Sequence, residues 1–426
     1  MRRLLYRTLL TAAVAVTGLN AQAENWTQWR GAERANRSSE TGLFGNWGAE
    51  GPPLAWTAEG LGSGYASVSV IGRRIFTTGN VGNTQSVVAI ESSTGKVIWT
   101  SPISDTAPKH GYDGSRSTPT IDGDKLYVVS SDGAIICMSG RDGKIIWRRG
   151  FDEFKGKMMS GWGFSESPLV DGDRVICTPG GNSAVVVALN KSTGENIWAC
   201  SLESSSEGQG LNEGAGYASP IISEGGGVRQ YVQLVGKGLI GIRARDGKLM
   251  WHYPRVANTT ANIPTALVDG DYVFTSTGYN TGSALLKLSS SGKGEVKAEE
   301  VYWLESKDLQ NKHGGMTLVD GHIYCGHGNG DGKPICVEMM TGDVAWGPER
   351  AEGRGETSTI YADGHIIYRR EDGVVILAKA TPEKFEVVRT FKPSFQQGAS
   401  WAHPVIANGV LYLREQDKLM AYKLGS

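Results

Sequence analysis

A tryptophan-ended segment recurs along this chain at a nearly constant spacing. Its clearest copies are AIESSTGKVIW, which ends at Trp99, and ALNKSTGENIW, which ends at Trp198. Tryptophans in this position follow one another every 43 to 53 residues, at Trp56, Trp99, Trp147, Trp198, Trp251, Trp303 and Trp346. Self-similarity at such a period indicates an array of supersecondary units, so the whole chain must be interpreted as repeats.

Each repeat also carries a glycine turn between two short apolar strands, as in IDGDKLYVV and VDGHIYCGH. Asp-Gly and Asn-Gly suit two-residue hairpins in which both central residues have φ > 0. Eight copies of this turn occur, at Gly72, Gly123, Gly172, Gly226, Gly270, Gly321, Gly364 and Gly409. Four strands per copy and no helical pattern predict an all-β fold, an eight-bladed β-propeller of four-stranded antiparallel blades.

The ends of the array predict how it closes. The eighth copy stops after its third strand, LMAYKL at 419–424, whereas LAWTAE at 54–59 matches an outer strand with no inner strands before it. We expect this N-terminal strand to complete the last blade, which removes an open sheet edge. The propeller then spans 54–426, and the polar, Gly-rich segment 24–53 is expected to be an extended arm packed on it.

Residues 1–23 resemble a signal peptide in their organisation. A basic start precedes an apolar run from Leu9 to Leu19 and a small-x-small site at Ala21–Ala23. A membrane anchor is the alternative, but the run is too short to span a bilayer. We therefore expect an exported protein, periplasmic or secreted, without a transmembrane anchor. Its 43 basic and 44 acidic residues give no reason to expect a nucleic-acid partner, and we expect a monomer.

The cysteines and histidines leave two alternatives open. Cys325 and Cys336 flank a Gly-rich turn and could form a disulfide across a hairpin, or could be two small buried hydrophobic residues. Together with His322 and His327 they could also be drawn as a metal site. Strand alternation places His322 on the opposite side from Cys325 and His327, so no metal site is predicted.

The segments AIESSTGKVIW, ALNKSTGENIW and RARDGKLMW resemble the pyrroloquinoline-quinone-like β-propeller repeat of quinoproteins and BamB-like proteins, with its tryptophan-docking motif. The resemblance covers about residues 54–426, although repeats five and seven lack the motif. It implies that the outer-strand tryptophans pack between neighbouring blades, each against a glycine of the adjacent motif. The residues concerned are Trp99, Trp147, Trp198, Trp251 and Trp346.

This family divides by function. Quinoprotein alcohol and sugar dehydrogenases hold the quinone and calcium on the propeller axis, BamB-like scaffolds bind no quinone, and further exported propellers form a third group. The chain has no adjacent cysteines, no Cys-x-x-Cys-His and no assignable calcium ligands. We therefore expect a non-catalytic binding or scaffold propeller without a cofactor and with a protein or saccharide partner. The alternative is an alcohol or sugar dehydrogenase dependent on pyrroloquinoline quinone and calcium, with a divergent site.

A binding site is expected where the innermost strands begin, around the central channel. Aromatic residues recur there, and four of them at equivalent points could stack on a flat or sugar-like ligand. The alternatives are that the rings only fill the channel and that the nearby charges are solvated or paired. No catalytic residue is predicted. The expected ligand-binding residues are Tyr65, Arg116, Trp162, Glu166, Tyr217, His313, Glu356 and Trp401, with Lys312 and His403 beside them.

Overall fold

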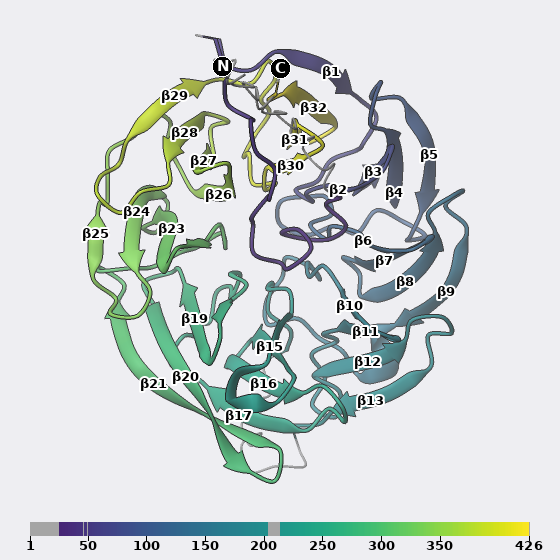
Figure 1. The fold of residues 1–426 in the computed structure, drawn as a ribbon. Helices are drawn as coiled ribbons and strands as arrows, with labels where there is room; N and C mark the ends of the chain where they lie inside the picture. Colours follow the sequence, from purple (N-terminus) through teal and green to yellow (C-terminus); the bar gives the residue numbers. More distant parts are fainter. Residues whose placement is uncertain (1–24, 46, 49, 203–213, 426) are drawn as a thin grey trace, which may run out of the picture.

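Eight four-stranded antiparallel sheets surround a central channel in the computed structural model, which describes residues 25–45, 47–48, 50–202 and 214–425 (Figure 1). The predicted all-β, eight-bladed propeller is confirmed. Helical structure in these ranges is limited to 3-10 turns, among them η1 (Phe151–Phe154) and η3 (Gly225–Gly227). No helix within them has the length and apolarity needed to cross a membrane. The predicted signal peptide, 1–23, lies outside the described residues.

Blades 1 to 4 follow the chain, and each begins with its innermost strand. Blade 1 contains β2 (Ser69–Ile71), β3 (Arg74–Val81), β4 (Thr84–Glu91) and β5 (Val97–Pro102). Blade 2 contains β6 (Thr120–Asp122), β7 (Lys125–Ser130), β8 (Ala134–Ser139) and β9 (Ile145–Gly150). Blade 3 contains β10 (Leu169–Asp171), β11 (Arg174–Cys177), β12 (Val186–Asn190) and β13 (Asn196–Cys200). Blade 4 contains β14 (Ile221–Ser223), β15 (Gln230–Val235), β16 (Gly238–Arg243) and β17 (Leu249–Tyr253).

Blades 5 to 8 continue the same order. Blade 5 contains β18 (Leu267–Asp269), β19 (Tyr272–Thr277), β20 (Gly282–Gly292) and β21 (Glu295–Glu305). Blade 6 contains β22 (Thr317–Val319), β23 (His322–His327), β24 (Lys333–Glu338) and β25 (Val344–Trp346). Blade 7 contains β26 (Thr357–Ala362), β27 (His365–Arg370), β28 (Val375–Lys379) and β29 (Val387–Phe391). Blade 8 contains β30 (Val405–Ala407), β31 (Val410–Glu415), β32 (Lys418–Lys423) and, as its outer strand, β1 (Leu54–Ala58).

The pairing of β1 with β32 closes the ring. The strands run antiparallel, with Trp56 opposite Ala421 and Thr57 opposite Met420. Figure 1 shows β1 on the outside of the last blade, next to β32. The predicted closure by an N-terminal strand is confirmed, and β32 gains a backbone partner that the C-terminal part of the chain does not supply.

The first turns of the blades are of two kinds, which corrects the expectation of one. In blades 6, 7 and 8 both central residues have φ > 0, as at Asp363 (46°) and Gly364 (72°). In blades 1, 2, 3 and 5 the glycine comes first and alone has φ > 0. Asp122, for example, pairs with Lys125, so that Gly123 (φ 61°) and Asp124 form the turn. A φ > 0 at the first central residue only is the φ pattern of a type II′ turn, in which that residue is glycine.

The outer-strand tryptophans share a local distortion and a neighbour. In six blades a β-bulge falls immediately before the tryptophan, as at Ile98, where Ala89 pairs with Trp99 and Ile90 with Val97. A bulge re-aims the side chain that follows it. The ring of Trp99 lies against Gly143 in blade 2, where an added Cβ would come within 2.7 Å of it.

The same contact joins three other pairs of blades, and Nε1 of each of these tryptophans donates to a carbonyl of the next blade. The pairs are Trp56 with Gly95, Trp147 with Gly194 and Trp198 with Gly247. Trp346 Nε1 donates to the Thr381 carbonyl of blade 7 at 2.9 Å. Trp251 differs: it lies against Gly241 of its own blade and donates to Gln230 Oε1 at 2.7 Å. Blade 5 lacks the Thr-Gly turn that would receive it, because the long β20–β21 hairpin stands in that place.

The arm crosses the channel mouth on the face that carries the glycine turns (Figure 1). Trp26 exchanges two backbone hydrogen bonds with Val70 in blade 1, and the Tyr361 N–H in blade 7 donates to the Asn36 carbonyl at 2.9 Å. Further on, Glu40 accepts the backbone N–H of Asn408 in blade 8. The arm therefore connects blades 7, 8 and 1, on both sides of the point where the ring closes.

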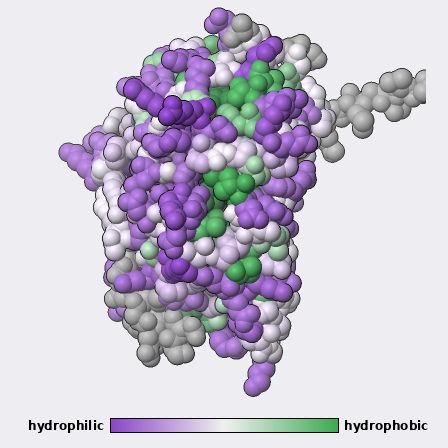
Figure 2. Space-filling model, turned by 90° about the vertical axis from the view of Figure 1, so that its left-hand side faces the viewer, coloured by the Kyte–Doolittle hydropathy of each residue, from purple (hydrophilic) through white to green (hydrophobic). Residues whose placement is uncertain are grey.

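The core consists of apolar layers between neighbouring blades. Phe76 and Val87 of blade 1, for example, pack against Leu126 and Ile136 of blade 2. The outer strands leave some large apolar side chains exposed, such as Val344 in β25. Figure 2 shows separate apolar clusters on a mostly hydrophilic side surface. Because burial is concentrated between blades, each blade is held in the ring by apolar contacts with its neighbours.

Candidate functional site

A cavity of about 360 Å³ opens where the inner strands begin, on the propeller axis. Seven of the eight blades and the arm contribute to its wall, and we call it the axial cup. Seven Trp and Tyr side chains line it: Trp29, Tyr65, Tyr112, Trp162, Tyr217, Tyr279 and Trp401. Aromatic rings with a few polar groups are typical of small-molecule sites.

One wall of the cup is built around Trp401, from the start of blade 8. Its ring centroid lies 4.9 Å from Tyr65, 4.8 Å from Tyr112 and 5.0 Å from His313. These three residues come from blades 1, 2 and 6. The contacts are tilted or edge-on, the arrangements that aromatic pairs prefer. They hold the Trp401 ring in a fixed orientation.

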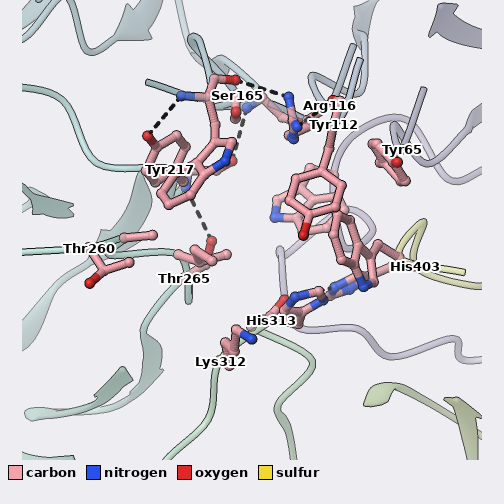
Figure 3. A pocket seen from close by; sticks show the side chains of 18 of the residues that line it. Tyr65, Tyr112, Arg116, Ser165, Tyr217, Thr260, Thr265, Lys312, His313 and His403 are labelled. Carbon is pink, nitrogen blue, oxygen red and sulfur yellow. Dashed lines mark hydrogen bonds between the residues drawn. The ribbon is translucent and has the colours of Figure 1, made fainter. Parts of the chain in front are cut away.

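Trp162 and Tyr217 form another aromatic wall, from blades 3 and 4 (Figure 3). Their ring centroids are 5.8 Å apart, and the Tyr217 hydroxyl lies 2.6 Å from Ser160 Oγ. Gly111 leaves room for the indole, because a Cβ there would approach Trp162 Nε1 to 2.9 Å. Figure 3 shows open space between Tyr217 and Tyr112.

The arm supplies the floor of the cup. The Trp29 ring packs against His403 from blade 8, with the ring centroids 4.5 Å apart and the planes tilted by 47°. The next residue, Arg30, is buried and donates to the carbonyls of Thr265 (3.2 Å) and Met316 (2.7 Å). Arg34, also buried, donates to the carbonyls of Ser167, Pro168 and Pro220. Two arginines therefore fasten the arm to inner-strand ends of blades 3 to 6.

Two cations reach the wall. The Arg116 guanidinium donates to four backbone carbonyls, including that of Trp162 at 3.0 Å, and burial lowers its pKa. Lys312 Nζ lies 5.1 Å from the centre of the Tyr279 ring and 3.5 Å from Glu356. No aspartate or glutamate is among the residues lining the cup in the described chain. The lining therefore supplies two cations and no anion, and the Glu356 carboxylate behind it pairs with one of them, Lys312.

The histidines of the cup are neutral at pH 7. Burial and the charge of Lys312 lower the pKa of His313 to about 3, and burial and Arg30 lower that of His403 to about 3. His403 Nε2 donates to the His313 carbonyl at 3.2 Å, so Nδ1 carries the free lone pair. This Nδ1 and the Trp401 Nε1–H are buried polar atoms without a partner among the described residues.

A belt of hydroxyl groups links successive blades on the other side of the cup. Thr118 Oγ1 accepts the Ser67 N–H, and Ser167 Oγ accepts the Thr118 N–H at 2.9 Å. Ser219 Oγ accepts the Ser167 N–H, and Thr265 Oγ1 accepts the Ser219 N–H. Ser167, Ser219 and Thr265 line the cup. Since each oxygen accepts a backbone N–H, its hydroxyl hydrogen can be directed to a ligand.

Six of the eight residues expected at the channel mouth line the cup: Tyr65, Arg116, Trp162, Tyr217, His313 and Trp401. Glu166 and Glu356 do not. Glu166 is buried behind the wall, where it accepts the Thr178 N–H, and burial raises its pKa to about 7 despite Arg34 nearby. Glu356 is buried and pairs with Lys312; burial raises its pKa as well.

Several lining residues were not expected from the sequence. Trp29 lies in an arm without periodicity, and Tyr279 follows β19 rather than preceding an inner strand. Tyr112 and the hydroxyl belt lie in the segments where a site was sought, and the recurrence of Ser or Thr just before the inner strands is a signal that could have revealed the belt.

The possible disulfide between Cys325 and Cys336 is not present. Both thiols are free and buried. Cys325 pairs with Ile335, and Cys336 pairs with Tyr324, so the two cysteines are one position out of register. Their side chains consequently point to opposite faces of the sheet, into different apolar layers.

The side chains of the cup do not fit calcium. Calcium takes about six to eight oxygen ligands, with carboxylates among them. The cup offers hydroxyls and two cations, and the acids Glu166 and Glu356 lie outside its lining. Within the described ranges, no three His, Cys, Asp or Glu side chains gather closely enough to hold a metal ion.

Residues 83–348 match the family model described as outer membrane protein assembly factor BamB, and no curated protein matches the chain. The solved structure of BamB from Moraxella catarrhalis has a TM-score of 0.61 at 14% identity, over 87% of this chain and 99% of that one. Quinohemoprotein alcohol dehydrogenase from Comamonas testosteroni scores 0.67 at 14% identity, over 96% and 82%. A europium-containing methanol dehydrogenase scores 0.64 at 12% identity, over 92% and 89%. At these identities the structural likeness shows the fold alone.

Proposed function

The chain belongs to the family described as outer membrane protein assembly factor BamB, and from that premise we propose that it is an exported, non-catalytic binding propeller whose axial cup holds a small ring-shaped ligand. One observation carries the proposal: fixed aromatic walls face one another across a cavity that is closed below by Trp29. Export rests on the predicted signal peptide and is in keeping with the family description.

The two aromatic walls support binding rather than simple filling of the channel. Rings that only filled it would leave no cavity, whereas about 360 Å³ stays open between them. This volume is at the lower end of the range of small-molecule sites, about 300–1,000 Å³. It suits one or two rings, either flat or sugar-like.

A dehydrogenase dependent on pyrroloquinoline quinone and calcium is the less supported function. The aromatic walls and the cations Arg116 and Lys312 suit a flat anion, but no carboxylate among the described residues lines the cup to hold the metal. We therefore propose binding without calcium-assisted redox chemistry. Dye reduction with alcohols and sugars, measured with added quinone and calcium, would reverse this assignment.

Tryptophan fluorescence tests the binding proposal directly. The purified mature protein is titrated with a panel of monosaccharides and flat aromatic acids, and a cup ligand is expected to quench emission saturably. Trp162→Leu should weaken binding about tenfold or more, because it removes a stacking surface. Trp99→Leu, in outer strand β5, is the matched control and should bind as the wild type does. Equal weakening by both substitutions would contradict the cup as the site.

The family match favours a second function, binding of a protein partner. A partner that docks on the face around the cup would be recovered from the cell envelope by the wild type. In that case neither the wild type nor the Trp162→Leu variant should respond to the small ligands. The variant should nevertheless recover less of the partner than the wild type does.

A further inference from the structure

The polar groups of the axial cup narrow the class of ligand, and this inference rests on the proposed function. The charge of the groups around the cup favours an anionic ligand. Arg116 and Lys312 reach the wall, and Arg30 lies buried beneath the floor, where it donates to carbonyls rather than to a carboxylate. The described chain as a whole buries six arginines against four glutamates. A bound carboxylate would reduce this excess of positive charge.

Lys312 is the cation best placed to meet the anion directly. The terminal nitrogens of Arg116 are already committed to the carbonyls of Gly111, Tyr112, Gly114 and Trp162. Lys312 has three N–H donors, and its pairing with Glu356 is long, at 3.5 Å. Two of its donors therefore stay available to a ligand.

The rest of the cup favours a polyhydroxylated ring over a flat aromatic one. Ser167, Ser219 and Thr265 line one side of the cup with hydroxyl groups. The unpartnered Trp401 Nε1–H needs an acceptor, and the unpartnered His403 Nδ1 needs a donor. A sugar hydroxyl serves as both donor and acceptor, whereas a flat aromatic acid would stack well but leave these groups unpaired, at a cost in affinity.

We infer that the cup binds an acidic monosaccharide of the uronate class, with its ring between the aromatic walls and its carboxylate on Lys312. The hydroxyl belt, Trp401 and His403 bind the ring hydroxyls. The rings supply stacking for the sugar face, and the cation selects the acid over the neutral sugar.

Calorimetric titration with D-glucuronate, D-glucose and 2-naphthoate tests this inference. Glucuronate is expected to bind at least about tenfold more tightly than glucose, the scale of one charge-assisted hydrogen bond. Lys312→Gln should bring the two sugars to within about twofold of each other. Glu356→Gln should tighten glucuronate binding severalfold, because it frees the ammonium group. Lys333→Gln on β24, an exposed lysine paired with Asp331, is the matched control and should keep the wild-type preference.

The possible results distinguish failure of the acidic-sugar inference from failure of the proposed ring-binding function. Equal affinity for both sugars, or a Glu356→Gln variant that weakens glucuronate binding, would overturn the acidic ligand. Naphthoate binding without sugar binding would overturn the saccharide class and leave a cup that binds rings. Absence of binding by all three probes in the folded wild type would count against the proposed function itself.

Discussion

Single atoms in the axial cup show the difference between a binding site and a packed core. Trp401 Nε1 and His403 Nδ1 are buried without a partner among the described residues. A buried polar group left unpaired costs about 1–3 kcal/mol. The protein tolerates this cost at two positions, both in residues that line the cup. A ligand that pairs both atoms would recover it as binding energy.

Trp401→Phe separates stacking from hydrogen bonding. The substitution keeps an aromatic ring in contact with Tyr65 and His313 but removes the Nε1–H donor. Binding of the ring ligand should weaken about tenfold. The free energy of unfolding should stay within about 1 kcal/mol of the wild type, because an unsatisfied donor is removed. Calorimetry and urea denaturation measure the two effects. A large loss of stability with unchanged affinity would assign Trp401 to packing.

His403 makes the free energy of unfolding depend on pH. Its pKa is about 3 in the folded protein, below the value of about 6.5 in an unfolded chain. The folded state therefore binds fewer protons between these values, and this contribution to stability, fully present above pH 6.5, is lost as the pH falls toward 3. His403→Gln should show a shallower decline in the free energy of unfolding from pH 7 to pH 4. Parallel declines in the two proteins would contradict a neutral buried imidazole.

The aromatic residues predicted from the sequence line the cup, whereas the two predicted acids, Glu166 and Glu356, do not. Glu166 shows the reason. The segment before each inner strand is extended, so alternate residues share a side. Ser165 and Ser167 line the cup, and Glu166 between them points away. The prediction rested on the residue types in these segments and did not distinguish charged side chains that point into the channel from those that point away. Alternation counted from Trp401 and His403, which also flank an outward residue, would have excluded Glu166.

Among the elements, the arm has the clearest role in the site. It carries Trp29 into the channel and is fastened there by buried arginines. Its sequence has no periodicity that would place these residues, because their partners are carbonyls of distant strands. Only the assembled ring brings those carbonyls to one place. The arm was expected to pack on the body, but its contribution to the cup was not.

Arg34→Met tests the fastening of the arm. Arg34 donates to three buried carbonyls that would be left unpaired, so the free energy of unfolding should fall by about 3 kcal/mol. Ligand affinity should fall with it, because the Trp29 floor loosens. Arg37→Met, an exposed arginine above Tyr361, is the control and should change stability by less than about 1 kcal/mol. Similar losses in both variants would contradict a specific role for Arg34.

The contacts between blades can be measured with two glycines. Gly95 has φ 72°, and a Cβ added to it would lie 2.5 Å from the Trp56 ring. Gly72 has φ 52° and open space around the position of such a Cβ. Both alanine variants bear the cost of a left-handed backbone. Gly95→Ala should be less stable than Gly72→Ala by about 1–3 kcal/mol, because the added methyl group overlaps the indole. Thermal unfolding of both compares them, and equal losses would show that Trp56 moves aside freely.

At the scale of the whole molecule, the repeat predicted the architecture because periodicity and closure are properties of the chain itself. Eight turn glycines, an outer strand without a blade at the N-terminal end and a blade without its outer strand at the C-terminal end leave one arrangement, in which β1 completes blade 8. Turn geometry was less predictable, since Asp-Gly-Asp in blade 2 allows the turn to begin at Asp122 or Gly123. The cup was only partly predictable, because it forms where seven blades and the arm meet.

A crystal structure of the protein grown with a saturating ring ligand from the fluorescence panel would show whether the axial cup is the binding site. We expect difference density for one ring inside the axial cup, between Trp162 and Trp401, with a polar group within hydrogen-bonding distance of Trp401 Nε1. Ligand density on an outer face, with no ring in the cup at saturation, would contradict it.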